Sequence, residues 1–204
     1  MKFPRATRLL VFVRTPEAAA RVYRSVEKYL TQRLKLVVNH HKSRTCSTNG
    51  VEFLGCQFHG FGGQIRVSAA NQAKFKRRVQ EITRRNRGVP MSGRLTELGR
   101  YVRGWMGYFG LEHRKTMFRQ LDKWLRRRIR ACYWKSWRLA KTRLRKLREL
   151  GISRDEALNH SYSRKGPWRI SASRAIQMAL PIEWLTARGL LILEDLWNQF
   201  APNR

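Results

Sequence analysis

Acidic residues are scarce in this sequence. Thirteen aspartates and glutamates stand against 44 lysines and arginines, which gives a formal net charge of +31. A folded chain this basic repels itself unless a polyanion lies close to it. We therefore expect a nucleic-acid partner. An anionic membrane is the weaker alternative, because the basic residues are spread over many segments and no single amphipathic anchor stands out.

Long apolar runs are also lacking. The run LLVFV at 9–13 is too short for the core of a secretory signal, and no run is long enough to cross a bilayer. The cysteines Cys46, Cys56 and Cys132 are scattered and odd in number. We expect them to be free thiols in a reducing compartment, and so predict a cytoplasmic protein of the bacterial type with no membrane contact.

The sequence offers no convincing catalytic or metal-binding constellation. His40, His41, Cys46, Cys56 and His59 lie near one another along the chain. On a strand, however, Cys56 and His59 would point to opposite faces and could not converge on one ion. The few acids are dispersed and form no carboxylate pair for two-metal chemistry. We therefore predict no metal, no cofactor and no catalytic residue.

Apolar residues make up 42% of the chain and include seven tryptophans, so a folded core is expected. Residues 1–67 have a mixed pattern. Apolar runs at 8–14 and 34–39 predict strands, the segment 53–67 predicts a hairpin with GFGG at its turn, and TPEAAARV predicts the start of a helix. The apolar residues expected to face inward from that helix are Ala20, Val22, Val26 and Leu30.

The remainder of the chain is predicted to be helical. A helix from Asn71 would bury Phe75, Val79 and Ile82. A second helix, around RYVRGWMGYFG, is followed by one long basic helix over 115–150, about 50 Å long if unbroken. Short helices follow Gly151. These patterns together predict an α+β fold in which a small mixed region precedes a mainly helical bundle.

The helix around RYVRGWMGYFG has two unlike faces. Its apolar stripe consists of Leu95, Leu98, Val102, Trp105 and Phe109. Gly104 and Gly107 fall on the opposite side, beside Arg100 and Arg103. An interior helical glycine costs about 1 kcal/mol relative to alanine, so bare backbone there needs a reason. Either a phosphate backbone or a second helix comes unusually close, and the flanking arginines favour nucleic acid.

The long helix adds basic residues with Trp134 and Trp137 among them. Aromatics among cations suit the stacking of bases, although we expect at least one of these tryptophans to be in the core. The residues predicted to contact RNA, chosen by charge and by helix face, are Lys76, Arg77, Arg84, Arg85, Arg100, Arg103, Gly104, Gly107, Arg126, Arg127, Arg130, Trp134, Lys135, Trp137, Arg138, Arg164, Lys165 and Arg169.

The chain resembles the group II intron-encoded reverse transcriptases, also called maturases. The matching segments, in order, are LVFVRTPEAAARV, LKLVVNHHKS, EFLGCQF, FKRRVQEITRRNRG, YVRGWMGYF, LDKWLRRRIRACYWKSWR and SRKGPWRISAS. The resemblance implies three regions: the end of a reverse-transcriptase palm at 1–67, a maturase-specific thumb at 68–150 and a helical tail at 151–204. In this family the thumb grips intron RNA and stabilises its splicing-competent fold, while the RNA itself performs the chemistry.

The resemblance breaks down at the catalytic motif of the family. Where relatives carry Tyr-Ala-Asp-Asp, whose aspartates hold the magnesium ions, this chain has Arg5-Ala6-Thr7-Arg8. Phosphoryl transfer by two metal ions cannot proceed without those carboxylates, and a cation at Arg8 would repel Mg²⁺. We therefore expect no enzyme activity, even though the family as a whole is one of reverse transcriptases.

The leading interpretation is an RNA-binding maturase-type fragment that stabilises folded group II intron RNA, its main expected partner, with target DNA as a further one. One alternative is a subunit of a split reverse transcriptase, with a complementing upstream half as its partner. Another is a truncated remnant of a mobile-element protein with no function. The sequence predicts no oligomeric state.

Overall fold

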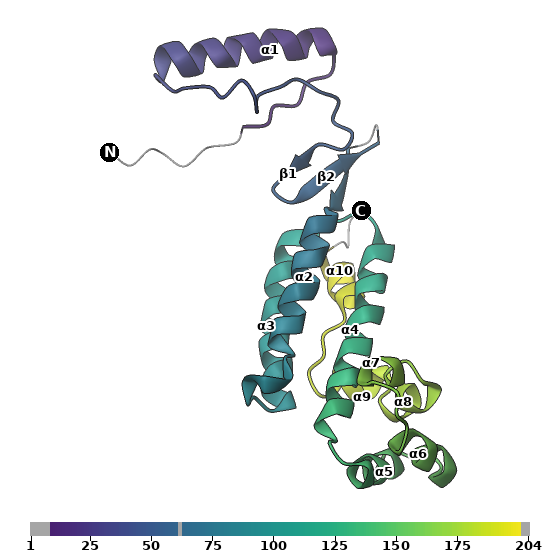
Figure 1. Cartoon of the computed structure of the whole chain (residues 1–204). Helices are drawn as coiled ribbons and strands as arrows, with labels where there is room; N and C mark the ends of the chain where they lie inside the picture. The colour runs from purple at the N-terminus through teal and green to yellow at the C-terminus, as the bar shows by residue number, and fades with distance from the viewer. Residues whose placement is uncertain (1–8, 61–62, 201–204) are drawn as a thin grey trace. The chain divides into compact units, whose positions relative to one another are not determined.

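The computed structural model of the chain describes residues 9–60 and 63–200, apart from the side chains of Arg85 and Phe200. Contacts divide the chain into two compact units, of which one ends at Ser68 and the other begins at Ala69 (Figure 1). The first unit holds a helix and a small sheet, and the second is helical. The predicted α+β fold is confirmed. Thr7 and Arg8, which stand where the resemblance places two aspartates, lie outside the described residues.

In the first unit, helix α1 (Pro16–Lys28) continues into a short π-helical turn at Tyr29–Arg33. The hydroxyl of Thr15 accepts a hydrogen bond from the backbone N–H of Ala18 at 3.2 Å, and Pro16 suits the first turn. No residue of α1 is buried, and Ala20 is exposed. The predicted helix is thus present, but its apolar stripe covers no closed core.

The sheet consists of three short antiparallel strands in the order β1 (Glu52–Phe53), β2 (Cys56–His59) and β3 (Gln64–Val67). The predicted hairpin is formed by β2 and β3. The additional strand β1 pairs with β2 through a two-residue turn in which Leu54 and Gly55 have φ angles of 51° and 81°. Two successive residues in the left-handed region are typical of the tight turn that matches the twist of a hairpin.

The two predicted strands at 8–14 and 34–39 are wrong over their described residues. Neither Leu9–Arg14 nor Leu34–Asn39 belongs to a sheet. Leu9, Phe12 and Val37 are exposed, Val37 almost completely, at 99%. A strand requires the backbone hydrogen bonds of a neighbour, and no described strand pairs with either segment. Apolar composition alone could not reveal that the neighbour is missing.

This first unit should be the more sensitive part of the chain to proteases. Among its described residues only Val67 and Ser68 are buried, and cleavage follows local opening of segments with little buried apolar area. In a time course with subtilisin, which does not depend on basic residues, we expect early cuts before residue 68 and a persistent fragment beginning near Ala69. Cleavage at equal rates along the chain, followed by mass spectrometry, would contradict this expectation.

The second unit begins with the antiparallel pair α2 (Ala69–Ile82) and α3 (Met91–Phe109), which are joined by a loop with a single 3₁₀ turn at Arg85–Arg87. Phe75, Val79 and Ile82 are buried, as predicted from their spacing. The ring of Phe75 lies 4.7 Å from that of Trp105 between centroids, which joins the two helices through aromatic packing.

Helix α4 (Lys115–Ser136) lies at the centre of this unit, with α2 and α3 to one side in Figure 1. It is buried on several sides, and its buried residues are Met117, Phe118, Leu121, Asp122, Leu125, Ile129, Arg130, Ala131, Cys132 and Trp134. A helix in the middle of a bundle needs more than one apolar stripe.

The expected unbroken helix over 115–150 is wrong. The chain leaves helical geometry at Trp137 (φ −83°, ψ 73°), and α5 begins anew over Ala140–Glu149. Trp137 is buried beside Trp134, with ring centroids 6.1 Å apart. Arg143 Nε donates a hydrogen bond to the Trp137 carbonyl at 2.8 Å, which fixes the corner. The Trp137 ring is buried at this break, and no glycine or proline marks it.

The C-terminal part forms α6 (Arg154–Ser161), α7 (Pro167–Ile170), α8 (Arg174–Ala179), α9 (Ile182–Thr186) and α10 (Leu193–Phe200). Helix α5 packs against α6, α7 packs on α4, and α10 contacts both α3 and α4 (Figure 1). Residues 151–200 therefore share one packed unit with the preceding helices. Among the described helices, none is long and apolar enough to cross a membrane.

Polar contacts join helix α10 to α4 and to the loop that precedes α4. Both carboxylate oxygens of Asp122 accept backbone hydrogen bonds at the start of α10, from Leu193 at 2.9 Å and Glu194 at 3.0 Å. The Trp197 indole donates to the Glu112 carbonyl at 2.8 Å. Since the first N–H groups of a helix have no partner within it, Asp122 acts as an N-cap supplied from another helix.

Candidate nucleic-acid interface

The exposed side of α3 carries the two glycines singled out in the sequence. A Cβ atom placed on Gly104 or Gly107 would meet nothing within 4 Å among the described residues. The opposite side of the helix buries Leu95, Leu98 and Val102. Among the described residues of this unit, no helix packs against the bare backbone at these two glycines, so the alternative of a close helix–helix contact finds no support there.

Arg100 and Arg103 lie on the same exposed side of α3. Neither makes a side-chain hydrogen bond or an ion pair with any residue that the structure describes. We call these four residues, Arg100, Arg103, Gly104 and Gly107, the glycine–arginine face. It combines two uncompensated guanidiniums, which bind phosphate oxygens in bidentate fashion, with backbone that a ligand can approach closely.

Helix α2 and the following loop contribute further predicted cations. Arg77 and Arg84 are exposed. Lys76 is half-buried, and its ammonium lies 5.8 Å from the ring centroid of Trp124. The side chain of Arg85 lies outside the described part of the chain. The side chains of Arg77 and Arg84 are thus accessible to a ligand, whereas Lys76 makes a cation–π contact with an aromatic ring of α4.

Three residues predicted to contact RNA are buried instead. Arg130, Trp134 and Trp137 have relative exposures of 8%, 1% and 8%. Arg130 Nε donates to the Leu180 carbonyl at 2.9 Å, and burial lowers the pKa of its guanidinium from the usual value. Arg143 covers the Trp134 ring at 4.8 Å. The prediction that these three contact RNA is wrong, because packing against other parts of the bundle buries them.

Arg126 and Arg127 are half-buried, while Lys135 and Arg138 are exposed. The guanidinium of Arg127 lies 4.2 Å above the Trp168 ring and donates to the Trp168 carbonyl at 3.1 and 3.2 Å. Arg127 therefore positions Trp168, which stays 41% exposed. This arrangement ties the tail to α4 and leaves an aromatic ring accessible beside basic residues.

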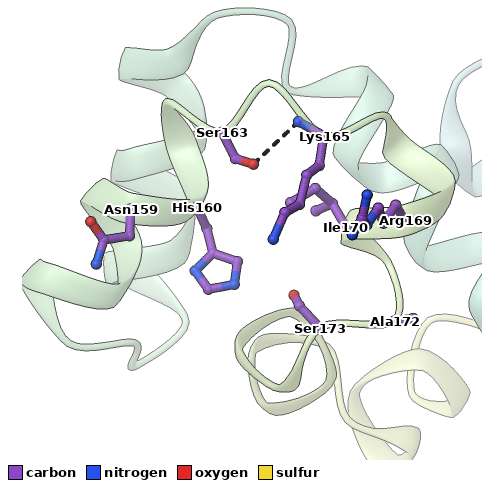
Figure 2. Close-up of a pocket in the computed structure, with 8 residues that line it drawn as sticks. All are labelled: Asn159, His160, Ser163, Lys165, Arg169, Ile170, Ala172 and Ser173. Atoms are coloured by element: carbon purple, nitrogen blue, oxygen red, sulfur yellow. Dashed lines mark hydrogen bonds between the residues drawn. The ribbon is translucent and has the colours of Figure 1, made fainter.

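The remaining predicted cations, Arg164, Lys165 and Arg169, are exposed on the loop after α6 and on α7. Lys165 and Arg169 line a hollow of about 350 Å³ between α6, α7 and the start of α8 (Figure 2). Arg164 does not belong to its lining.

The cysteines and histidines form no evident metal site in the part of the chain that is described. No group of three His, Cys, Asp or Glu residues there could hold a metal ion. Cys46 is exposed, Cys56 is half-buried and Cys132 is buried, all as free thiols. Burial raises the pKa of the Cys132 thiol, whose sulfur lies 3.7 Å from the Thr83 carbonyl.

Two exposed aromatics near these cations were missed by sequence reasoning. Tyr108 follows Gly104 by one helical turn and is 49% exposed. Trp168 is held by Arg127 as described above. Exposed rings among cations can stack on bases. Each ring lies in a short motif beside glycine, GYF or GPW, which could have drawn attention to it. Whether the ring is exposed, however, depends on tertiary packing.

Residues 72–151 match the family model of the group II intron, maturase-specific domain. This stretch contains α3 with its glycine–arginine face, α4 and α5. A search of curated proteins finds no match to the chain. The match is consistent with the C-terminal maturase, or thumb, region of an intron-encoded protein.

Residues 72–151 are thus similar to a group II intron maturase-specific domain. This domain indicates a maturase-type role in group II intron splicing and an interaction with group II intron RNA.

Proposed function

We propose that this protein binds the folded RNA of a group II intron and stabilises its splicing-competent form. The observation that carries the proposal is the glycine–arginine face, which is exposed, carries two unpaired guanidiniums and lies within the matched domain. The net charge of +31 supplies long-range attraction to phosphates. Exposed Tyr108 and Trp168 offer rings for unstacked bases.

We also propose that the protein has no polymerase activity of its own. Thr7 and Arg8 stand where the resemblance places two metal-binding aspartates. Without these carboxylates the magnesium ions that drive phosphoryl transfer have no ligands at that position. The protein would then act through binding alone, by favouring one fold of an RNA that performs its own chemistry.

A second candidate is a subunit of a split reverse transcriptase. Exposed Leu9, Phe12 and Val37 in the first unit favour it, because such apolar segments suit a sheet supplied by another polypeptide. Primer extension by the protein together with the product of any upstream reverse-transcriptase gene would support this candidate.

The proposed function is tested by competition binding at near-physiological salt, with the host's own group II intron RNA set against an unrelated folded RNA of equal length. We expect a preference of at least about tenfold, or 1.4 kcal/mol, and faster or more complete splicing when the protein is added. Equal affinity for both RNAs would mean that the positive charge binds polyanions indiscriminately. Unchanged splicing would remove the maturase role even if binding remained.

A further inference from the structure

The hollow in the C-terminal part has a lining of unusual chemistry. Its residues come from α6, the loop after it, α7 and the start of α8 (Figure 2). The lining residues, which we call the basic pocket, are Asn159, His160, Ser163, Lys165, Arg169, Ile170, Ala172 and Ser173. No acidic residue is among them, and neither Lys165 nor Arg169 forms an ion pair with the residues that the structure describes.

One polar atom of the basic pocket has no partner. Ser173 Oγ is buried and makes no hydrogen bond within the described part of the chain. Figure 2 shows it directed toward the space that His160 and Lys165 also face. A buried hydroxyl without a partner is unfavourable, so a group that binds it would remove a penalty already present in the fold.

Two further contacts fix the donors around this space. Ser163 Oγ accepts the backbone N–H of Lys165 at 3.2 Å, which holds the loop (Figure 2). His160 Nδ1 lies 2.8 Å from the Glu156 carbonyl. Because a carbonyl can only accept, Nδ1 carries the hydrogen of this bond, and Nε2, which bears no hydrogen in the neutral ring, is an acceptor. These two contacts hold the loop backbone at Lys165 and the His160 ring in place.

The chemistry of the lining identifies the class of ligand. Two uncompensated cations and no carboxylate make the lining unsuited to a metal cation. A phosphate group satisfies a guanidinium, an ammonium and hydroxyl donors together. The volume of about 350 Å³ lies in the range of pockets that hold a small ligand, enough for a nucleotide to enter with its phosphate.

We propose that the basic pocket binds one phosphate group of a nucleic-acid strand, with Lys165, Arg169 and Ser173 as its ligands. This inference rests on the proposed function in naming nucleic acid as the source of the phosphate. It adds a discrete site outside the matched domain, which ends at residue 151. The tail would thus grip a single strand position, while the glycine–arginine face contacts folded RNA.

The test is a titration of the full chain with short ligands, followed by NMR chemical shifts. The probes are the dinucleotides pUpU and UpU, with uridine as the ligand that lacks phosphate. We expect shifts at the Ser163, Lys165 and Ser173 amides with a phosphate-bearing probe and none with uridine. Similar affinities for pUpU and UpU identify a backbone phosphate, and binding of pUpU alone identifies a strand end. Failure of both to shift these amides overturns the proposal.

Variants separate the pocket from general charge. The double variant Lys165→Gln/Arg169→Gln is expected to weaken dinucleotide binding at least about tenfold. The matched control Lys141→Gln/Arg154→Gln removes the same two charge types from exposed positions on α5 and α6, outside the lining. We expect it to lower affinity by less than about threefold, because it changes only the screened overall field. Equal losses in the two variants would overturn the proposal.

Ser173→Ala gives an independent readout. It should weaken dinucleotide binding while leaving Tm unchanged or higher, because it removes a buried hydroxyl that has no partner. Unchanged binding in a folded Ser173→Ala protein would exclude the hydroxyl as a ligand and overturn the site as proposed. Intron RNA binding should persist in the pocket variants through the glycine–arginine face, so failure of the pocket and failure of the proposed function are distinguishable.

Discussion

Asp122→Ala is expected to lower the free energy of unfolding by roughly 3 kcal/mol and to release α10 from the bundle. Asp122 is 1% exposed and accepts the backbone N–H groups of Leu193 and Glu194 at 2.9 and 3.0 Å. Alanine at position 122 would remove both hydrogen bonds and leave the backbone N–H groups of Leu193 and Glu194 without the side-chain cap that Asp122 provides. The loss should exceed that of an ordinary surface substitution several-fold.

Urea unfolding followed by circular dichroism measures this loss. The matched control is Asp195→Ala, which removes an exposed carboxylate from the first turn of the same helix without touching the cap. We expect the control to change stability by less than about 1 kcal/mol, through the helix dipole and through loss of the Coulombic repulsion between Asp195 and Asp122. Equal effects of the two substitutions would show that the buried cap contributes nothing beyond its charge.

The pH dependence of the Asp122 contribution follows from its burial. Desolvation raises the pKa of Asp122 from 3.8 to about 6, against the two backbone donors, which lower it. Between pH 3.8 and about 6, the carboxyl group of Asp122 is protonated in the folded protein and ionised in the unfolded chain. Stability from this group is therefore greatest below pH 4 and declines as pH rises toward 6. The stability difference between the wild type and Asp122→Asn should fall by up to about 3 kcal/mol over this interval.

Leucine at Gly104 or Gly107 is expected to weaken intron RNA binding by at least about tenfold without weakening the fold. Both positions are open to solvent, with nothing within 4 Å of an added Cβ in the described structure. A bulky side chain there keeps a phosphate backbone away from α3, while its Cβ meets no described protein atom. Since leucine is also a better helix former than glycine, any loss of binding cannot be attributed to unfolding.

Alanine at the same two positions tests the reason for the glycines. Each Gly→Ala substitution should raise the free energy of unfolding by about 0.5–1 kcal/mol, because it removes backbone freedom from the unfolded chain. The protein therefore forgoes stability at two exposed sites. If the alanine variants bound RNA as well as the wild type and the leucine variants did too, close approach to this face would be ruled out.

The arginines of the same face have their own expected signature. Arg100→Ala/Arg103→Ala should reduce RNA affinity about 10- to 100-fold at fixed salt. It should also make the plot of log K against log salt less steep by roughly 1.5, as expected for two lost phosphate contacts. The controls are Gln120→Leu for the glycines and Arg154→Ala/Arg174→Ala for the arginines, all at exposed positions away from this face of α3. Equal losses in the controls would contradict a specific interface.

Local patterns were enough to predict the helices of the first half of the bundle. The spacing of Phe75, Val79 and Ile82 identified the buried side of α2, and the apolar stripe of α3 identified its open glycine side. Each of these helices presents one side to the core, so the periodicity of the sequence reports burial directly. The hairpin at 53–67 was also predictable, because glycines at its turn and alternating strand residues are local signals.

Where a residue's environment depends on distant segments, local patterns misled. The apolar runs at 9–13 and 34–39 suit strands, but the structure gives them no partner among the described strands. The long basic helix breaks at Trp137, although the sequence has no glycine or proline there. Arg130 is buried and donates a hydrogen bond to the carbonyl of Leu180, which lies fifty residues further along the chain. None of these contacts leaves a mark in the nearby sequence.

The sequence by itself determined that the protein is strongly basic, and its patterns predicted a mainly helical chain similar to the maturases. Net charge, the spacing of apolar residues and short sequence motifs can be read from the sequence, and folding does not alter them. Only the tertiary structure decided which cations are free to bind a ligand. Arg127 packs on the Trp168 ring and Arg130 donates a hydrogen bond to the Leu180 carbonyl, whereas Arg100 and Arg103 stay exposed. The reason is physical: a guanidinium is available only where packing brings no carbonyl, ring or carboxylate to it.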